Sequence, residues 1–426
     1  MKQQVFWHTT ARMPTDADLT PLPAQVDVAI IGGGFTGLSA ARTLAQNGAK
    51  VAVLEAETIG WGASSRNGGM VLTGLKLPMQ TVIRRYGREL AKRLFQASLD
   101  SIDTVEQIVK EEAIECGFAR TGHLLTANKP SHFDALQAEV EFMDKEFGHK
   151  VHLVSKQNQR MEIGSDLYHG ALVDEVSAGV NPAQFVVGLA GAAERAGVSL
   201  YARAQVTRLE RGTNGFTVET GRGRLSAKSV LAATSGYTGR VTQNLQRRII
   251  PIGSFIIATE RLSDEVTREV SPKNRMIFDY KHYLNYFRLW DNRLVFGGRA
   301  AFFPENENTV RESAEILRRE MVTVYPQLRG ARVDYAWGGT LDFAFDQMTH
   351  VGELDGVTYS LGYAGHGVAM GTHLGKTVAE AMLKGTVKEH PFAAFDFPRA
   401  PLGLYDGRPW FLPLAGLWHR ILDWAE

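Results

Sequence analysis

Residues 26–55, VDVAIIGGGFTGLSAARTLAQNGAKVAVLE, constrain the fold more than any other part of the chain. An apolar, β-branched run ends at three glycines, a segment with helical spacing of apolar residues follows, and a second apolar run ends at Glu55. This order predicts a strand, a tight turn, a helix and a second strand. We therefore expect a βαβ unit near the N-terminus.

Gly32, Gly34 and Gly37 form the pattern G-x-G-x-x-G within this unit. Gly32 would permit the turn, Gly34 would let the backbone approach a pyrophosphate, and Gly37 would let the helix pack closely on the strand. Glu55, 18 residues after Gly37, is expected to accept hydrogen bonds from the ribose hydroxyls of an adenosine. The alternative is a glycine turn that binds nothing.

Composition limits the classes of partner. The 426 residues exceed the usual reach of one core, so two domains are expected. A net charge of +1 gives no electrostatic reason to expect nucleic acid or an anionic membrane. The single cysteine, Cys116, excludes a disulfide or a thiolate metal cluster within one chain and is expected to be buried; we expect no metal site.

The N-terminal residues do not resemble a targeting signal. They lack the run of about 7 to 15 apolar residues of a signal peptide, and no stretch of the chain approaches the roughly 18 apolar residues of a membrane span. We therefore expect a cytoplasmic protein. Residues 1–25 contain three prolines and are expected to form an extended arm anchored by Phe6 and Trp7.

A second glycine-rich segment, IGWGASSRNGGMV, occupies residues 59–71. Four glycines with serines, an arginine and an asparagine between them indicate a backbone that bends closely around something flat and polar. A flexible surface loop is the alternative, although such loops seldom lie between a strand and an apolar continuation.

These two segments together resemble the D-amino-acid-oxidase-like superfamily of FAD oxidoreductases, and within it the γ-glutamylputrescine oxidoreductase subfamily. The resemblance implies FAD as the cofactor, with the second glycine segment along the isoalloxazine, a backbone contact to the adenine at Val206, and a turn at Gly236 that closes over the ADP half. This chain has Ser65 where many members have glycine, and Thr234 where glycine or asparagine is usual.

A third glycine-rich segment, residues 359–383, reads as strand, glycine turn and helix. A helix N-terminus suits negative charge, so the amides of residues 365–370 are expected to stabilise the reduced flavin. A purely structural helix start is the alternative. The residues expected at the cofactor are Gly32, Gly34, Phe35, Thr36, Gly37, Glu55, Ala63, Ser64, Arg66, Asn67, Gly68, Gly69, Val206, Gly236, Gly365, His366, Gly367 and Val368.

The remaining segments complete an α/β fold of the two-domain α+β type. Alternating patterns over 245–345, with a hairpin turn at Asp291-Asn292, predict an antiparallel sheet, and a helix is expected from Val310 to Tyr325. Asn181 and Pro182 read as the cap and first residue of another helix. We expect a Rossmann-like FAD-binding domain interleaved with an antiparallel-sheet substrate domain. The expected parts are a discontinuous FAD-binding domain of residues 1–80, 150–244 and 346–390, a helical excursion at 81–149, a substrate domain at 245–345 and a C-terminal tail at 391–426.

The candidate catalytic residues lie on the antiparallel sheet and in the third glycine turn. They are Tyr286, Arg299, His366 and Trp337. For the aromatic residues the alternative role is core packing, and for Arg299, as for Arg288, it is a surface charge on a strand.

Two absences narrow the chemistry. Amino-acid and glycine oxidases of this superfamily clamp the substrate α-carboxylate with an arginine ahead of the last glycine turn, whereas this chain has Ala336-Trp337-Gly338-Gly339-Thr340 there. A simple D-amino acid or glycine is therefore disfavoured as a substrate. The sarcosine-oxidase-like relatives attach the flavin to a cysteine, and none lies in this region, so FAD is expected to be noncovalent.

These observations predict an enzyme that oxidises the C–N bond of an amine by hydride transfer to flavin N5, giving an imine that water hydrolyses. Its substrate would be a secondary or N-substituted amine or γ-glutamylputrescine, with O2 or another electron acceptor, and the protein would be a monomer or homodimer. The alternatives are a quinone- or partner-linked dehydrogenase and a flavin-binding subunit without turnover. Docking of the aromatic tail on the body is preferred to contact with a second subunit or a membrane.

Overall fold

The computed structural model describes residues 1–14, 20–281, 284–301, 306–400 and 405–412, with the backbone alone described at 299–301. Most of the aromatic tail, residues 413–426, lies outside the described residues. Among the described residues no helix combines the length and apolar character that a membrane span requires. Cys116 is buried as expected, and burial raises the pKa of its thiol to about 11.

The first of two large sheets contains the predicted βαβ unit. Its central strand β1 (Gln25–Ile31) pairs in parallel with β2 (Val51–Leu54) on one side and with β11 (Gly223–Ala232) on the other. The other strands are β8 (Ser199–Tyr201) beside β2, β18 (Val357–Leu361) and β17 (His350–Leu354) beyond β11, and an antiparallel branch of β9 (Val206–Gly212) and β10 (Gly215–Thr220).

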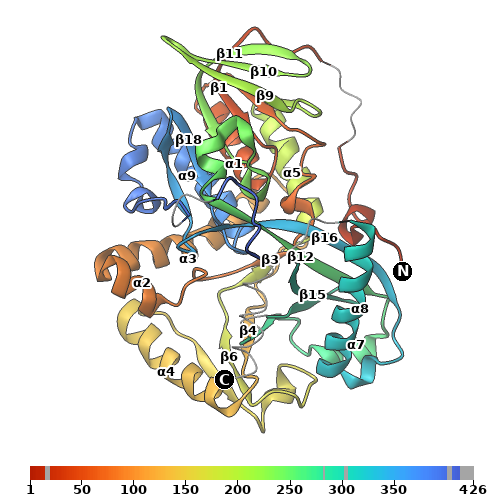
Figure 1. The fold of residues 1–426 in the computed structure, drawn as a ribbon. Coiled ribbons are helices and arrows are strands. Elements are labelled where there is room, and N and C mark those ends of the chain that lie inside the picture. Colours follow the sequence, from red (N-terminus) through yellow and green to blue (C-terminus); the bar gives the residue numbers. More distant parts are fainter. Residues whose placement is uncertain (15–19, 282–283, 302–305, 401–404, 413–426) are drawn as a thin grey trace.

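Three helices accompany this sheet in the upper part of the molecule (Figure 1). They are α1 (Phe35–Gln46), α5 (Pro182–Arg195) and α9 (Ala369–Lys384). Helix α1 packs directly against α9, and a Cβ built on Gly375 of α9 would lie 2.4 Å from the Thr36 carbonyl oxygen of α1. Two helices from opposite ends of the chain therefore approach until backbone meets backbone.

The second sheet is mostly antiparallel and forms the lower half of Figure 1. Its strands, in order across the sheet, are β16 (Val333–Ala344), β12 (Ile249–Thr259), β15 (Arg293–Ala301), β14 (Tyr286–Trp290), β13 (Met276–Asp279), β4 (His123–Thr126), β6 (Gly170–Asp174) and β5 (His152–Ser155). Helix α8 (Glu307–Val324) contacts β12, β15 and β16, and the shorter α7 (Asp264–Val270) lies on the same side of the molecule (Figure 1). Phe287 and Phe296 stack in its core with ring centroids 5.0 Å apart.

Several local predictions are confirmed. Asp291 and Asn292 both have positive φ, as a two-residue turn between β14 and β15 requires. The Asn181 side chain accepts hydrogen bonds from the amides of Ala183 and Gln184, so it caps α5 as expected. Helix α8 matches the helix expected at 310–325 within three residues at its start and one at its end.

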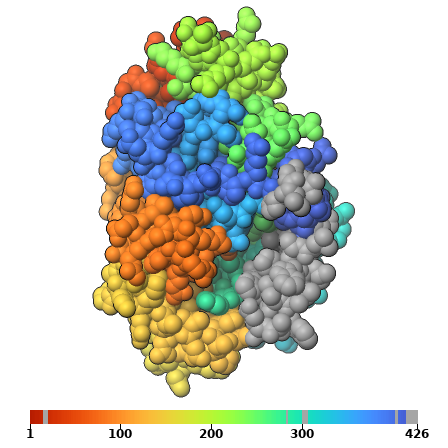
Figure 2. Space-filling model, turned by 60° about the vertical axis from the view of Figure 1, so that its left-hand side comes forward, coloured from red at the N-terminus to blue at the C-terminus, as the bar shows by residue number. Residues whose placement is uncertain are grey.

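The segment expected as a helical excursion contains α2 (Met79–Tyr86), α3 (Arg88–Glu111) and α4 (Pro130–Phe147), and it also supplies strand β4. Strands β5 and β6, at 152–174, pair with each other, and β6 pairs with β4 in the second sheet. The first sheet resumes only at β8. In Figure 2 the orange α2–α3 segment lies directly against the blue segments around α9, in agreement with the contact between α3 and α9.

The contact between α1 and α9 gives a test with two glycines in helix interiors. Gly375→Ala should lower stability by about 1–3 kcal/mol, because its methyl group would overlap the Thr36 carbonyl. Gly191→Ala in α5 should be neutral or stabilising by up to about 1 kcal/mol, because only the end of Arg195 lies near its new methyl group. Thermal unfolding followed by circular dichroism compares them; equal midpoints would contradict the tight helix contact.

Candidate functional site

The first glycine turn has no room for side chains. Gly32 has a φ of +110°, and a Cβ there would lie 2.5 Å from the Ala233 carbonyl oxygen. A Cβ on Gly37 would lie 2.0 Å from the Gly32 carbonyl oxygen, and one on Gly34 would lie 2.7 Å from Ser64 Oγ. The turn therefore brings the N-terminus of α1 close to the end of β11 and to the second glycine segment.

Glu55 lies at the end of β2 and faces this turn. Its carboxylate accepts hydrogen bonds from the amides of Gly33 at 2.7 Å and Glu57 at 2.9 Å. Burial raises the pKa of Glu55, and the two amides act in the opposite direction because they favour the ionised form. The Glu55 carboxylate, a hydrogen-bond acceptor, therefore lies beside the first glycine turn, which is the position that the sequence predicted for it.

A cavity of about 430 Å³ runs past this turn and joins all three glycine segments. Twelve of the predicted cofactor residues line it: Gly32, Gly34, Phe35, Thr36, Glu55, Ala63, Ser64, Asn67, Val206, Gly365, Gly367 and Val368. The cavity also has lining residues that the sequence did not single out, namely Trp61, Gln205, Thr234, Ser235, Tyr237, Leu341, Asp342 and Tyr363 among others. Residues that lie far apart in the sequence, from 31 to 368, therefore line one cavity.

The other six predicted cofactor residues are not among those that line the cavity. They are Gly37, Arg66, Gly68, Gly69, Gly236 and His366. A Cβ on Gly236 would lie 2.8 Å from the Leu341 carbonyl oxygen, so this glycine lets its turn pack on β16 while Thr234 and Ser235 line the cavity.

Arg66 and Asn67 shape the second glycine segment by bonding to its own backbone. Arg66 donates to the carbonyl oxygens of Trp61 and Gly338 at 2.9 and 3.3 Å and lies over the Trp61 ring. The Asn67 side chain accepts from the Gly69 amide at 2.7 Å and donates to the carbonyl of Ala63. These contacts fix the backbone of a tight loop.

Two buried indoles hold the same loop from outside. Trp337 Nε1 donates to the Arg66 carbonyl oxygen and Trp7 Nε1 donates to that of Asn67, both at 2.8 Å. Trp337 is 2% exposed and Trp7 is fully buried. The structure therefore places Trp337 in the core as a support of the loop, and it shows that the N-terminal arm takes part in the site. The aromatic pair Phe6-Trp7 in a proline-spotted arm was the only sequence signal for that role.

Strand β14 closes the far side of the loop. Arg288 is 3% exposed and donates to the carbonyl oxygens of Gly69 at 2.7 Å and Val180 at 3.1 Å, and its burial lowers its pKa to about 10. A Cβ on Gly68 would lie 3.2 Å from the ring of Tyr286, whose hydroxyl is 3.0 Å from Ser254 Oγ. Burial raises the pKa of Tyr286 to about 12, so it stays protonated. The surface-charge alternative for Arg288 is wrong, because its guanidinium is buried and bonded to backbone; the side chain of Arg299 lies outside the described residues.

The third glycine segment leads into α9. The Tyr363 hydroxyl lies 2.8 Å from Thr36 Oγ1 and ties this turn to the first one. Burial lowers the pKa of His366 to about 4, and its Nδ1 has no hydrogen-bond partner among the described residues. Asp342 accepts from the Gly362 amide at 2.7 Å, and its burial raises its pKa. Gly365, Gly367 and Val368, the residue before α9, line the cavity, so the start of this helix lies beside it.

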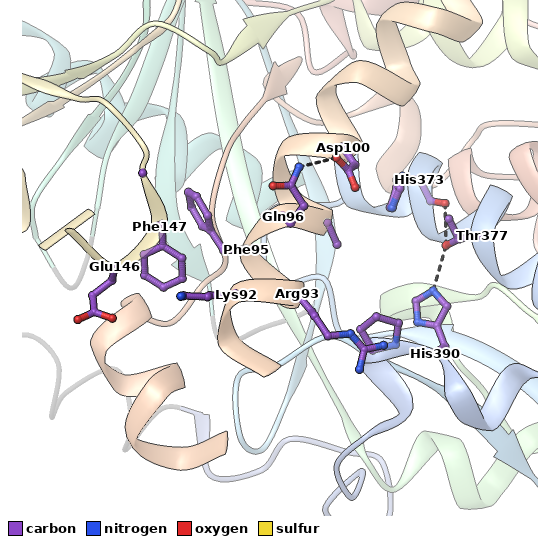
Figure 3. A pocket seen from close by; sticks show the side chains of 13 residues that line it. Lys92, Arg93, Phe95, Gln96, Asp100, Glu146, Phe147, His373, Thr377 and His390 are labelled. Atoms are coloured by element: carbon purple, nitrogen blue, oxygen red, sulfur yellow. Dashed lines mark hydrogen bonds between the residues drawn. The ribbon is translucent and has the colours of Figure 1, made fainter. Parts of the chain in front are cut away.

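A larger hollow of about 840 Å³ lies on another side of α9 (Figure 3). It is lined by residues of α3, the end of α4, α9 and the segment at 390–391, and none of its lining residues belongs to the three glycine turns. His373 Nδ1 lies 2.8 Å from Thr104 Oγ1, and His390 Nε2 lies 3.1 Å from Thr377 Oγ1. Burial lowers the pKa of both histidines to about 4.

The comparisons with known proteins agree with this architecture. The model of the family described as FAD dependent oxidoreductase (DAO) matches residues 27–381. γ-Glutamylputrescine oxidoreductase of Escherichia coli K12 is 33% identical over 380 residues, covering 88% of this chain and 87% of that protein. The probable oxidoreductase OrdL of Haemophilus influenzae is 32% identical over 391 residues, covering 90% and 88%. Glycine oxidase of Geobacillus kaustophilus has a similar fold, with a TM-score of 0.73 at 21% identity over 89% of this chain and 99% of that one. The resemblance inferred from the glycine segments is confirmed.

The buried histidines predict how stability depends on pH. Because the folded protein holds the pKa of His373 and His390 near 4, the unfolded chain binds protons first as the pH falls below about 6.5. The neutral histidines therefore contribute fully to the free energy of unfolding above that pH. This contribution is lost between pH 6.5 and 4, at up to about 1.4 kcal/mol per pH unit for each histidine. Unfolding midpoints from pH 7.5 to 4.5 should fall less steeply in His373→Gln, whereas the exposed His152→Gln should follow the parent; parallel curves for all three would refute this.

Proposed function

The chain belongs to the DAO family of FAD-dependent oxidoreductases, and from that premise we propose that it oxidises the C–N bond of a secondary or N-substituted amine, with γ-glutamylputrescine as the leading candidate. Members of the family and the relatives of this chain act on amines or amino acids with FAD as the cofactor. The proposal selects among these substrates.

The similarity to the γ-glutamylputrescine enzyme carries the proposal. It extends over 88% of this chain at 33% identity, whereas the matched glycine oxidase of Geobacillus kaustophilus is 23% identical over a similar length. The segment from Ala336 to Thr340, where an amino-acid oxidase would place an arginine for the α-carboxylate, contains none. Arg66 and Arg288 bond to backbone carbonyl oxygens, which supports the view that neither serves as that clamp.

The cavity fits FAD in its chemistry. Gly32 and Gly34 line the cavity and let the backbone approach a ligand closely, and the carboxylate of Glu55 lies beside them as an acceptor for the ribose hydroxyls. At the other end, the buried Nδ1 of His366 has no partner among the described residues. We propose that the cofactor residues expected from the sequence hold FAD along this cavity without a covalent bond.

Bound FAD supplies a two-electron acceptor for the substrate hydride. The protein then has to place the carbon–hydrogen bond and to leave the reacting nitrogen neutral. Tyr286, protonated and beside Gly68, would form one wall of that space, and His366 would form a neutral part of another. The amides at the start of α9 would stabilise negative charge that develops at the end of the cavity. Loss of hydride from carbon and of a proton from nitrogen leaves an imine, which water hydrolyses.

Anaerobic reduction of the holoprotein tests this proposal. γ-Glutamylputrescine should bleach the flavin absorbance near 450 nm at micromolar to millimolar concentration, and glycine or D-alanine should bleach it far more slowly. The matched control is the same titration with sarcosine, which reports on small secondary amines. Bleaching by D-amino acids alone would reject the proposal, and re-admission of air with detection of peroxide would show whether O2 is the electron acceptor.

Glu55 gives a test of the cofactor site that needs no substrate. Glu55→Gln should raise the dissociation constant of FAD about tenfold, because a charge-assisted acceptor becomes neutral. Glu194→Gln, an exposed carboxylate on α5, serves as the control. Apoprotein prepared from each variant is titrated with FAD by flavin fluorescence; equal affinities would remove Glu55 from the site.

A further inference from the structure

The hollow of about 840 Å³ beside α9 (Figure 3) shares no lining residue with the cavity that joins the glycine segments. Its walls come from α3, the end of α4, α9 and residues 390–391. A concave space of this size is within the range of small-molecule sites in proteins. Its polar and apolar groups therefore indicate which class of ligand it could bind.

His373 of α9 brings an unused hydrogen-bond acceptor to this hollow. Its Nδ1 lies 2.8 Å from Thr104 Oγ1, and the Thr104 hydroxyl donates its single proton to the backbone carbonyl oxygen of Asp100 at 2.9 Å. Nδ1 must therefore carry the imidazole proton, which leaves a lone pair on Nε2. His373 is only 9% exposed, yet Nε2 is accessible and has no hydrogen-bond partner among the described residues. An acceptor in this state favours a ligand that donates a hydrogen bond.

The carboxylate of Asp100 lies near the same imidazole and lines the same hollow (Figure 3). Burial lowers the pKa of His373 to about 4, and the negative charge of Asp100 acts in the opposite direction. Asp100 accepts a hydrogen bond from Gln96 Nε2 at 2.8 Å and has no cationic partner in the described part of the chain. A neutral acceptor beside a free carboxylate suits an ammonium group, which has several donors and a positive charge.

Two cations line the hollow farther toward the N-terminus of α3. Lys92 and Arg93 precede Asp100 by eight and seven residues, which correspond to about 10–12 Å along a helix axis. Neither forms an ion pair with a residue that the structure describes, whereas Glu146, which also lines the hollow, is paired with Arg88 at 2.7 Å. Lys92 and Arg93 are therefore available to an anion.

The rest of the wall is largely apolar or already satisfied. Phe95, which lies on α3 between the cations and Asp100, packs against Phe147 of α4 with ring centroids 4.8 Å apart, and Pro391 also lines the hollow. Both ring nitrogens of His390 have partners within the protein. This wall offers contact to methylene groups rather than further hydrogen bonds.

We propose that this hollow binds an ω-amino acid in an extended conformation. The ammonium group would lie at His373 Nε2 and Asp100, the carboxylate at Lys92 and Arg93, and the methylene chain along Phe95. A chain with eight bonds between the nitrogen and the carboxyl carbon spans about 10 Å, which matches the separation of the charges along α3. The site lies apart from the cofactor cavity, so the inference goes beyond the proposed oxidation and does not depend on it.

Calorimetric titration of the holoprotein with three matched compounds tests the proposal. 8-Aminooctanoate has both charges, nonanoate has a methyl group in place of the ammonium, and octylamine has one in place of the carboxylate. 8-Aminooctanoate should bind at least about fivefold more tightly than either, because each analogue loses one charge-assisted interaction. Equal dissociation constants for the three compounds, or no binding of 8-aminooctanoate at about 20 mM, would overturn the proposal.

Glycylglycylglycine distinguishes an apolar chain from a peptide. It has the same two charges and the same number of bonds between them, but its amides would face the phenylalanine wall without partners. It should therefore bind more weakly than 8-aminooctanoate. Binding as tight as that of 8-aminooctanoate would overturn the assignment of the ligand as an ω-amino acid.

Variants assign each end of the ligand to its side chains. Asp100→Asn should abolish the advantage of 8-aminooctanoate over nonanoate, and the double change Lys92→Gln with Arg93→Gln should abolish its advantage over octylamine. Lys145→Gln, which removes an exposed charge of α4 outside the lining, should behave as the parent. Advantages that persist in both variants would contradict the proposed site. The comparison of ligands in the unaltered protein stands even if a variant fails to fold.

The flavin spectrum separates this site from the cofactor cavity. 8-Aminooctanoate is itself an amine, and binding beside the flavin would perturb or bleach its absorbance. Binding in the hollow should leave the anaerobic flavin spectrum unchanged and should weaken in Asp100→Asn. A perturbed spectrum, with the same affinity in the parent and in Asp100→Asn, would place the compound in the cofactor cavity and reject the proposed site. If no amine reduces the flavin, the proposed oxidation fails while the result for the hollow is unaffected.

Discussion

Two backbone contacts that only glycine permits hold the start of α1 in place. Gly37 packs over the carbonyl of Gly32, and Gly375 of α9 packs over the carbonyl of Thr36. Helix α9 begins directly after the third glycine turn. The second contact therefore brings the residues near 365 to the N-terminus of α1, which the first glycine turn precedes. The hydrogen bond between Thr36 and Tyr363 adds a side-chain link between the two turns. The cavity that joins the three segments depends on this close approach.

The second glycine segment is held by its carbonyl oxygens, from three directions. Trp337 of the second sheet holds the carbonyl of Arg66, Trp7 of the N-terminal arm holds that of Asn67, and Arg288 of β14 holds that of Gly69. Each donor is buried, and a buried carbonyl left without a donor would cost about 1–3 kcal/mol. The arrangement satisfies these three carbonyl oxygens with protein groups. It also couples both sheets and the N-terminus to the geometry of one loop.

Features that depend on neighbouring residues could be predicted from the sequence. Features that depend on contacts between distant segments could not. The βαβ unit, the Asp291-Asn292 turn and the cap at Asn181 follow from residue type and spacing alone, and the structure confirms them. The roles of Trp7 and Asp342 have no local signature, because each depends on which segment lies opposite in the fold. The place of β5 and β6 in the second sheet has no local signature either, because it follows from the pairing of β6 with β4 and of β5 with β6. The cofactor-binding roles assigned from the sequence stay predictions, although twelve of those residues line one cavity.

Under the proposed amine oxidation, charge favours an acylated amine over a free diamine as the substrate. Arg66 and Arg288 donate to backbone carbonyl oxygens, and the lowered pKa of His366 keeps that side chain neutral near pH 7. A free diamine carries two positive charges, and the second would have to enter the site as a cation or lose its proton at a cost. Acylation of one nitrogen removes that charge, and an acyl group ending in a carboxylate replaces it with the opposite sign. The reacting nitrogen at the other end then needs to lose only its own proton before hydride leaves the adjacent carbon. The segment from Ala336 to Thr340 contains no arginine, which agrees with the proposal that the substrate carries no carboxylate next to the bond that breaks.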